Sequence, residues 1–167
     1  MEDRSTTCCF TGHRQVKSEH QPLLERVLLH AIKVLYNRGY RGFLAGGALG
    51  FDTIAAKAVL EAKEYLHDIE LTLILPCQNQ AKNWKQSDIT VYKEILEQAD
   101  KVMYTSQVYT RGCMMIRNRA LVDNSSYCVS YQYKSGGGTS YTVGYAQSKG
   151  ITVYNTAGRI EELLQGG

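Results

Sequence analysis

Short apolar runs and helical periods alternate along the chain from one end to the other. The apolar runs contain β-prone residues and end near glycine or proline, whereas the segments between them repeat apolar residues every three or four positions. Strands that alternate with helices in this way are typical of βαβ units, in which the strands are parallel. We therefore predict an α/β fold: a Rossmann-like, doubly wound and mostly parallel sheet of about six strands, flanked by helices.

The 167 residues are enough to form one hydrophobic core, so we expect a single domain over residues 1–167. The periods predict strands over 6–11, 42–45, 69–75, 101–104, 127–131 and 151–154. They predict helices over 21–38, 53–66, 114–122, 141–148 and 160–164, with a further helix around 91–96 after a loop or short helix over 78–86.

Composition excludes several classes of protein. The net charge is only +3 and the Lys and Arg residues are scattered, which disfavours nucleic-acid binding. The five cysteines occupy mostly apolar segments, and we expect free thiols in a cytoplasmic protein without a secretory leader. No Cys/His spacing indicates a metal site, and no apolar stretch approaches the roughly 20 residues of a membrane span.

A first glycine-rich loop, residues 46–52 (GGALGFD), follows the predicted strand 42–45. It has neither the GxGxxG spacing of dinucleotide folds nor the Gly-Lys-Ser/Thr of a P-loop. Gly46, Gly47 and Gly50 could let the main chain approach a ligand closely, and Asp52 could bind a ribose hydroxyl. The alternative is a tight turn in which Asp52 is an ordinary helix N-cap. The sequence leaves both interpretations open.

A second glycine-rich loop, residues 135–140 (SGGGTS), follows the predicted strand 127–131. Its backbone N–H groups and hydroxyls stand at a helix start, where an anion is stabilised. We predict that this loop holds a phosphate; the alternative, a flexible linker, does not suit a position between a buried strand and an apolar helix. The candidate residues are Gly136, Gly137, Gly138, Thr139 and Ser140.

Two further groups of polar residues follow predicted strands. Gly12, His13 and Arg14 come directly after the first strand, at the sheet edge where open α/β proteins bind ligands. Arg117 and Asn118 lie near the start of the helix 114–122, where an arginine could pair with a phosphate or a carboxylate. For these side chains the alternative is a solvated basic surface.

The chain resembles the SLOG superfamily of Rossmann-like proteins, which includes DNA-processing protein A and the Lonely Guy phosphoribohydrolases. The resemblance rests on residues 46–52, on residues 114–119 (MMIRNR) and on Gly136 to Thr139, and residues 10–14 (FTGHR) are most similar to the small YpsA-like branch. It implies a nucleotide pocket with the glycine loops on phosphate, no required cofactor, and a homodimer.

The chain departs from the Lonely Guy pattern at its two glutamates, whose positions are occupied by Tyr141 and Thr142. Neither residue can replace a carboxylate in the cleavage of an N-glycosidic bond. We therefore expect a non-enzymatic module that senses or sequesters a nucleotide of the ADP-ribose, NAD or AMP type. The alternatives are a nucleoside-monophosphate phosphoribohydrolase and, third, a single-strand DNA binder.

Overall fold

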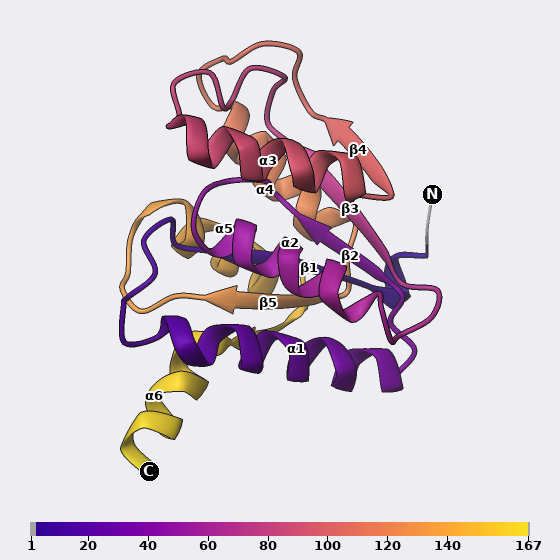
Figure 1. Ribbon diagram of the computed structural model, residues 1–167, viewed down its shortest axis with the longest axis vertical. Coiled ribbons are helices and arrows are strands. Elements are labelled where there is room, and N and C mark those ends of the chain that lie inside the picture. The colour runs from indigo at the N-terminus through magenta and orange to yellow at the C-terminus, as the bar shows by residue number, and fades with distance from the viewer. Residues whose placement is uncertain (1–2, 167) are drawn as a thin grey trace.

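Six parallel strands form the sheet, in the order β4-β3-β2-β1-β5-β6. The computed structural model describes residues 3–166 (Figure 1). The predicted Rossmann-like α/β fold is confirmed. The elements after a short 3-10 turn at Arg4–Thr6 are β1 (Thr7–Gly12), α1 (Gln21–Asn37), β2 (Gly42–Ala45), α2 (Phe51–Ala62), β3 (Glu70–Leu75), α3 (Gln86–Gln98), β4 (Lys101–Tyr104), α4 (Cys113–Asp123), β5 (Tyr127–Tyr131), α5 (Gly137–Ser148), β6 (Thr152–Asn155) and α6 (Thr156–Gly166).

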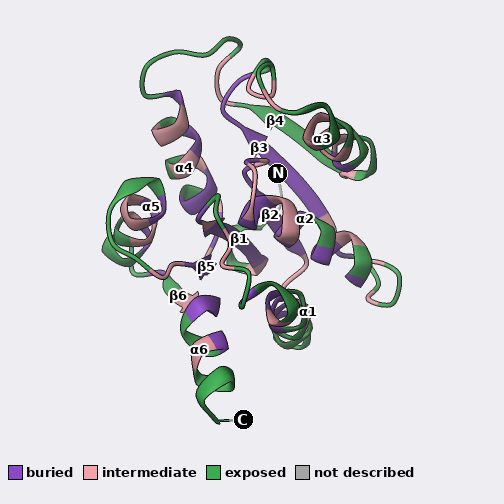
Figure 2. Ribbon diagram, turned by 60° about the vertical axis from the view of Figure 1, so that its left-hand side comes forward, coloured by how far each residue is buried: buried purple, intermediate pink, exposed green. Residues whose placement is uncertain are grey.

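Helices cover both faces of the sheet, as Figure 2 shows. Successive strand residues point to opposite faces. Phe10 and Phe43 therefore stack on the face that α1, α2, α3 and α6 cover, at 6.2 Å between ring centroids. Cys9, Leu44 and Cys128 pack on the other face with α4 and α5. No helix within residues 3–166 is both long enough and apolar enough to span a membrane.

Three helices begin four or five residues earlier than the sequence predicted. The prediction for α5 was wrong by four residues, because the helix starts at Gly137 and not at Tyr141. Similarly, α3 begins at Gln86 and α6 at Thr156. The first turns of these helices contain few large apolar residues, so they carry no apolar period that could reveal them. For α5 the difference matters, since it places the glycines inside the first helical turn.

Candidate functional site

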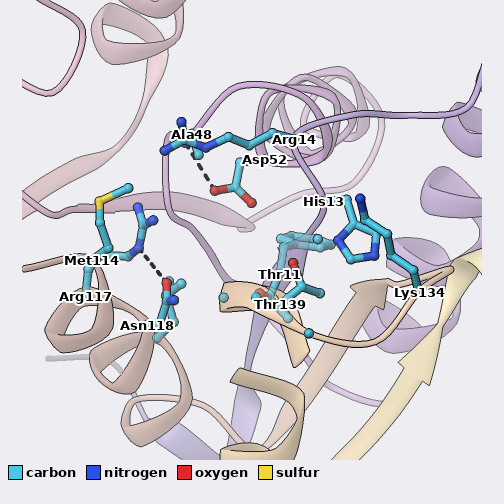
Figure 3. A pocket seen from close by; sticks show the side chains of 16 residues that line it. Thr11, His13, Arg14, Ala48, Asp52, Met114, Arg117, Asn118, Lys134 and Thr139 are labelled. Atoms are coloured by element: carbon cyan, nitrogen blue, oxygen red, sulfur yellow. Dashed lines mark hydrogen bonds between the residues drawn. The ribbon is translucent and has the colours of Figure 1, made fainter. Parts of the chain in front are cut away.

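A cavity of about 340 Å³ opens where the strand order reverses. β1 pairs with β2 on one side and with β5 on the other, so the chain builds the sheet outward from β1 through β2, β3 and β4 and then returns to β5 and β6 on the opposite side. Such a switch point leaves a crevice at the carboxyl ends of the strands. Ten of the fourteen predicted site residues line this cavity (Figure 3): Gly12, His13, Arg14, Asp52, Arg117, Asn118, Gly136, Gly137, Gly138 and Thr139.

Six lining residues were missed by sequence reasoning: Phe10, Thr11, Ala48, Met114, Leu121 and Lys134. Helical spacing could have revealed two of them. Met114 lies three residues before Arg117 and Leu121 four residues after it, so all three share one face of α4. Lys134 directly precedes the second glycine loop, and this position in the sequence could have indicated that it lines the cavity.

Four predicted residues do not line the cavity, and three of them are the glycines of the first loop. A Cβ at Gly46 would lie 2.7 Å from an Arg117 guanidinium nitrogen and 2.9 Å from Asp52 Oδ2. A Cβ at Gly47 would overlap the Leu75 side chain, and one at Gly50 would overlap the Arg14 backbone. These glycines therefore permit close packing behind the cavity wall. The fourth residue, Ser140, lies in the first turn of α5.

Replacing Gly50 with alanine is expected to destabilise the protein strongly. Gly50 has a φ of 79°, which disfavours any side chain, and its Cβ would collide with the backbone carbonyl of Arg14. Together these effects are expected to cost about 3 kcal/mol of unfolding free energy. The matched control is Gly138→Ala, whose Cβ would meet only Asn118 at 3.6 Å. The midpoint of thermal unfolding should fall strongly for Gly50→Ala and stay near the wild-type value for Gly138→Ala. Equal midpoints for the two variants would contradict the packing role of Gly50.

The first turn of α5 forms one wall of the cavity. Gly136 is the N-cap, and it provides no side-chain hydrogen bond to the helix start. The first N–H groups of a helix have no partner within the helix, and they carry its positive end. A Cβ at Gly136 or Gly137 would meet nothing within 4 Å. In contrast to the first loop, this loop keeps open space above the backbone, as an anion would require.

Asp52 and Arg117 are two buried groups of opposite charge in the cavity lining. Asp52 is 6% exposed and Arg117 is 4% exposed. The Arg117 guanidinium donates to the Gly46 carbonyl, and its Nε donates to Asn118 Oδ1 at 2.9 Å. The Ala48 N–H donates to Asp52 Oδ2 at 3.1 Å. Asp52 is not the N-cap of α2, because that position belongs to Gly50.

The electrostatics of this pair follow from its burial. Desolvation raises the pKa of the Asp52 carboxyl, although the positive charge of Arg117 and the Ala48 N–H act in the opposite direction. Desolvation likewise lowers the pKa of Arg117, and Asp52 counteracts it. Each charge thus offsets part of the other's desolvation. Arg117 is not part of a solvated basic surface: much of its hydrogen-bonding capacity is directed into the fold.

Two exposed cations remain at the cavity, Arg14 and Lys134. Arg14 follows β1 and Lys134 follows β5. Because these two strands are parallel neighbours, both residues lie at the same edge of the sheet. Figure 3 shows Arg14 beside Asp52, and Lys134 beside His13. Neither side chain is buried, and both can therefore reorient toward an anion on α5.

His13 is 9% exposed and lines the cavity on the side of Lys134. Its backbone N–H donates to the Tyr131 carbonyl at 3.2 Å, and its ring meets Tyr133 edge-on at 4.6 Å between centroids. Burial lowers the pKa of the imidazole, the Lys134 ammonium lowers it further, and the Lys134 backbone carbonyl partly counteracts both. Burial and the Lys134 charge therefore both favour the neutral ring over the imidazolium. Its Nε2 atom has no hydrogen-bond partner within residues 3–166.

One group in the described part of the chain has the spacing of metal ligands, and it lies outside the cavity lining. Glu19, His20 and Glu161 each offer one ligand atom, all within 4.8 Å of one another. His20 is fully buried and already bonded, at 2.7 Å to the Tyr131 hydroxyl and at 2.6 Å to Glu161. This network joins the start of α1 to β5 and α6, which is a structural role.

Comparison with known proteins assigns the family. Residues 8–156 match the family model YpsA, described as the YspA SLOG family. The chain belongs to the YpsA SLOG family. One relative, the UPF0398 protein YpsA of Bacillus subtilis (strain 168), is 25% identical over 129 residues, which cover 75% of this chain and 72% of the relative. The predicted membership of the SLOG superfamily, in its YpsA-like branch, is thereby confirmed.

Solved structures support the fold of this YpsA SLOG protein. DNA processing protein A of Streptococcus pneumoniae superposes with a TM-score of 0.69 at 15% identity, over 98% of this chain and 57% of that one. DNA processing protein A of Helicobacter pylori was studied for its single-stranded DNA binding mode. It superposes with a TM-score of 0.65 at 18% identity, over 90% of this chain and 64% of that one. The chain thus spans less than two thirds of either protein, and these identities establish the fold alone.

The residues that replace the Lonely Guy glutamates in this YpsA SLOG protein do not line the cavity. Thr142 is fully buried, and its hydroxyl donates to the Gly138 carbonyl at 2.8 Å. The Tyr141 hydroxyl accepts a bond from Arg119 Nε at 2.7 Å, and its ring stacks on Tyr145. Both side chains serve helix packing, and neither is placed to act on a ligand in the cavity.

Proposed function

We propose that the cavity binds the phosphate of a nucleotide or nucleotide-derived small molecule, and that the protein senses or sequesters this ligand. The observation that carries the proposal is the first turn of α5, whose N–H groups open without a side-chain cap onto a cavity flanked by Arg14 and Lys134. A helix N-terminus with adjacent cations favours a phosphate over any neutral group.

The rest of the cavity suits the remaining parts of a nucleotide. Its volume of about 340 Å³ lies within the range of small-molecule sites. Phe10, Met114 and Leu121 supply apolar surface for a ring, whereas Asn118 offers an amide and Asp52 a carboxyl group. No carboxylate occupies the Lonely Guy catalytic positions, so binding is better supported than cleavage of the N-glycosidic bond.

Calorimetry against AMP, NAD and ADP-ribose tests this proposal. Arg14→Ala and Lys134→Ala are each expected to weaken binding about three- to tenfold, because each removes one charge that faces the phosphate. Lys33→Ala removes an exposed charge from α1, outside the cavity lining, and should leave the affinity unchanged. If the folded wild-type protein gives no heat with any of the three ligands, the proposal fails.

Single-stranded DNA is a second candidate ligand, because the Helicobacter pylori DNA processing protein A that shares this fold binds it. A strand would place one of its backbone phosphates on α5 and would leave the rest outside the cavity. This candidate predicts a mobility shift with an oligodeoxynucleotide that weakens steeply as salt rises. A shift that Lys134→Ala reduces, together with no binding of mononucleotides, would favour DNA over the small ligand.

A further inference from the structure

A groove between α1, α6 and the last two strands lies apart from the cavity at the switch point, and none of the described residues lines both. Figure 1 shows that α6 leaves the sheet beside α1. Two adjoining cavities of about 310 Å³ and 470 Å³ form this α1–α6 groove, and each lies within the size range of small-molecule sites. Three residues line both cavities: His30, Tyr154 and Arg159.

The wall that α1 contributes to the α1–α6 groove is apolar. Ala31 and Leu35 are buried at its base, whereas Val34 is exposed. On the opposite side, the exposed Leu163 of α6 lines the larger cavity. Removing such a surface from water is favourable, so the groove suits a ligand with an apolar body.

Two tyrosine hydroxyls in the groove have no hydrogen-bond partner. Tyr154 of β6 pairs with Val129, which lies two residues after Tyr127 in β5. Both tyrosines therefore point to the same face of the sheet, where they pack against the larger core. Neither hydroxyl forms a hydrogen bond within residues 3–166. Burial raises the pKa of both phenols, so each keeps its proton at neutral pH and can donate to a ligand.

The charged residues that line the groove are cationic. Arg159 lines both cavities, and Arg26 lines the larger one. Arg159 shares its charge with Glu162, at 3.1 Å between Nη1 and Oε2, whereas Arg26 forms no ion pair within residues 3–166. No aspartate or glutamate is among the described residues that line either cavity. The charge of the groove therefore complements an anion.

We propose that the α1–α6 groove binds a small amphipathic carboxylate, whose ring or alkyl chain lies on α1 and whose carboxylate accepts hydrogen bonds from Tyr127 and Tyr154. A carboxylate has two acceptor oxygens, so it can satisfy both hydroxyls, while Arg159 beside them supplies the opposite charge. This binding site is separate from the cavity at α5 and does not depend on the ligand bound there.

Calorimetry with 2-naphthoate, and with 2-naphthylmethanol as its uncharged counterpart, tests this proposal. The wild-type protein should bind the carboxylate at one site and the alcohol about tenfold more weakly. The double variant Tyr127→Phe/Tyr154→Phe keeps both rings and removes both donors. It should bind the carboxylate about tenfold more weakly than the wild type, and its affinity for the alcohol should change by less than about threefold. Tyr65→Phe, at an exposed position outside the groove, is the matched control and should keep the wild-type affinity.

Four outcomes would overturn the inference. The first two are no saturable binding of 2-naphthoate by the folded wild-type protein, and equal affinity of the wild type and the double variant. Loss of 2-naphthoate binding in Lys134→Ala would place the probe in the other cavity. A wild-type dimer in sedimentation velocity that Leu163→Glu separates would show that a second copy covers the groove. None of these results bears on nucleotide binding at α5.

Discussion

Arg117→Ala is expected to lower the free energy of unfolding by about 3–5 kcal/mol, because it removes a buried positive charge that offsets the desolvation of the buried Asp52. The substitution leaves the Asp52 carboxylate, at 6% exposure, without the charge of Arg117 and with the exposed Arg14 as the remaining cation beside it. It also leaves the Gly46 carbonyl without the guanidinium that donates to it. Urea denaturation followed by circular dichroism measures the loss. The loss would appear as a lower urea concentration at the unfolding midpoint, with an unchanged dependence of the unfolding free energy on urea concentration.

Two further variants identify the cause of this loss. Arg119→Ala removes an exposed arginine from the same helix, and it should change stability by no more than about 0.5 kcal/mol. Adding Asp52→Asn to Arg117→Ala removes the unpaired buried charge, and it should restore part of the lost stability. If the Arg117→Ala variant is as stable as the wild type, Arg117 and Asp52 do not support the fold through their opposite charges.

Gly137→Asp is expected to weaken nucleotide binding about 30-fold or more. The aspartate would place a negative charge in the first turn of α5, where the proposed phosphate accepts hydrogen bonds. Because a Cβ at this position meets nothing within 4 Å, the side chain itself causes no clash. Calorimetry with the nucleotide that binds the wild type measures the effect.

The control for this variant is Gly137→Ala. The glycine has a φ of 79°, so alanine and aspartate bear a similar backbone cost of about 1 kcal/mol. Only the aspartate adds a charge. The alanine variant should therefore bind within about threefold of the wild type. If both variants lose binding equally, the backbone conformation of the loop matters and the anion site at α5 is not supported.

The sequence was sufficient to predict the sheet because the strands are short runs with β-prone residues, which are mostly buried in β1, β2, β3 and β5 and more exposed in the edge strands β4 and β6. The predicted spans 42–45, 101–104 and 127–131 coincide with β2, β4 and β5. Parallel strands place all their carboxyl ends at one edge, so the loops after them could be assigned to a common site without coordinates. Ten of the predicted residues line the cavity for this reason.

The sequence could not distinguish a glycine that faces a ligand from a glycine that packs against a neighbouring chain segment. In the sequence, Gly46 and Gly137 both stand in a glycine-rich segment between a predicted strand and a predicted helix. Only the packing shows that the first presses against Arg117 and Asp52, while the second has open space above it. The state of His13 was equally hidden, because its burial depends on Tyr131 and Tyr133 from a distant part of the chain.

The two glycine loops have different consequences for sequence change among related chains. Substitutions in the first loop, or at Arg117, disturb close packing, and a chain that carries them loses its fold before its ligand preference can change. Arg14 and Lys134 are exposed and make no contact on which the core depends. Substitutions at these two positions can therefore change which ligand binds without loss of the fold, while the buried residues behind the cavity stay the same.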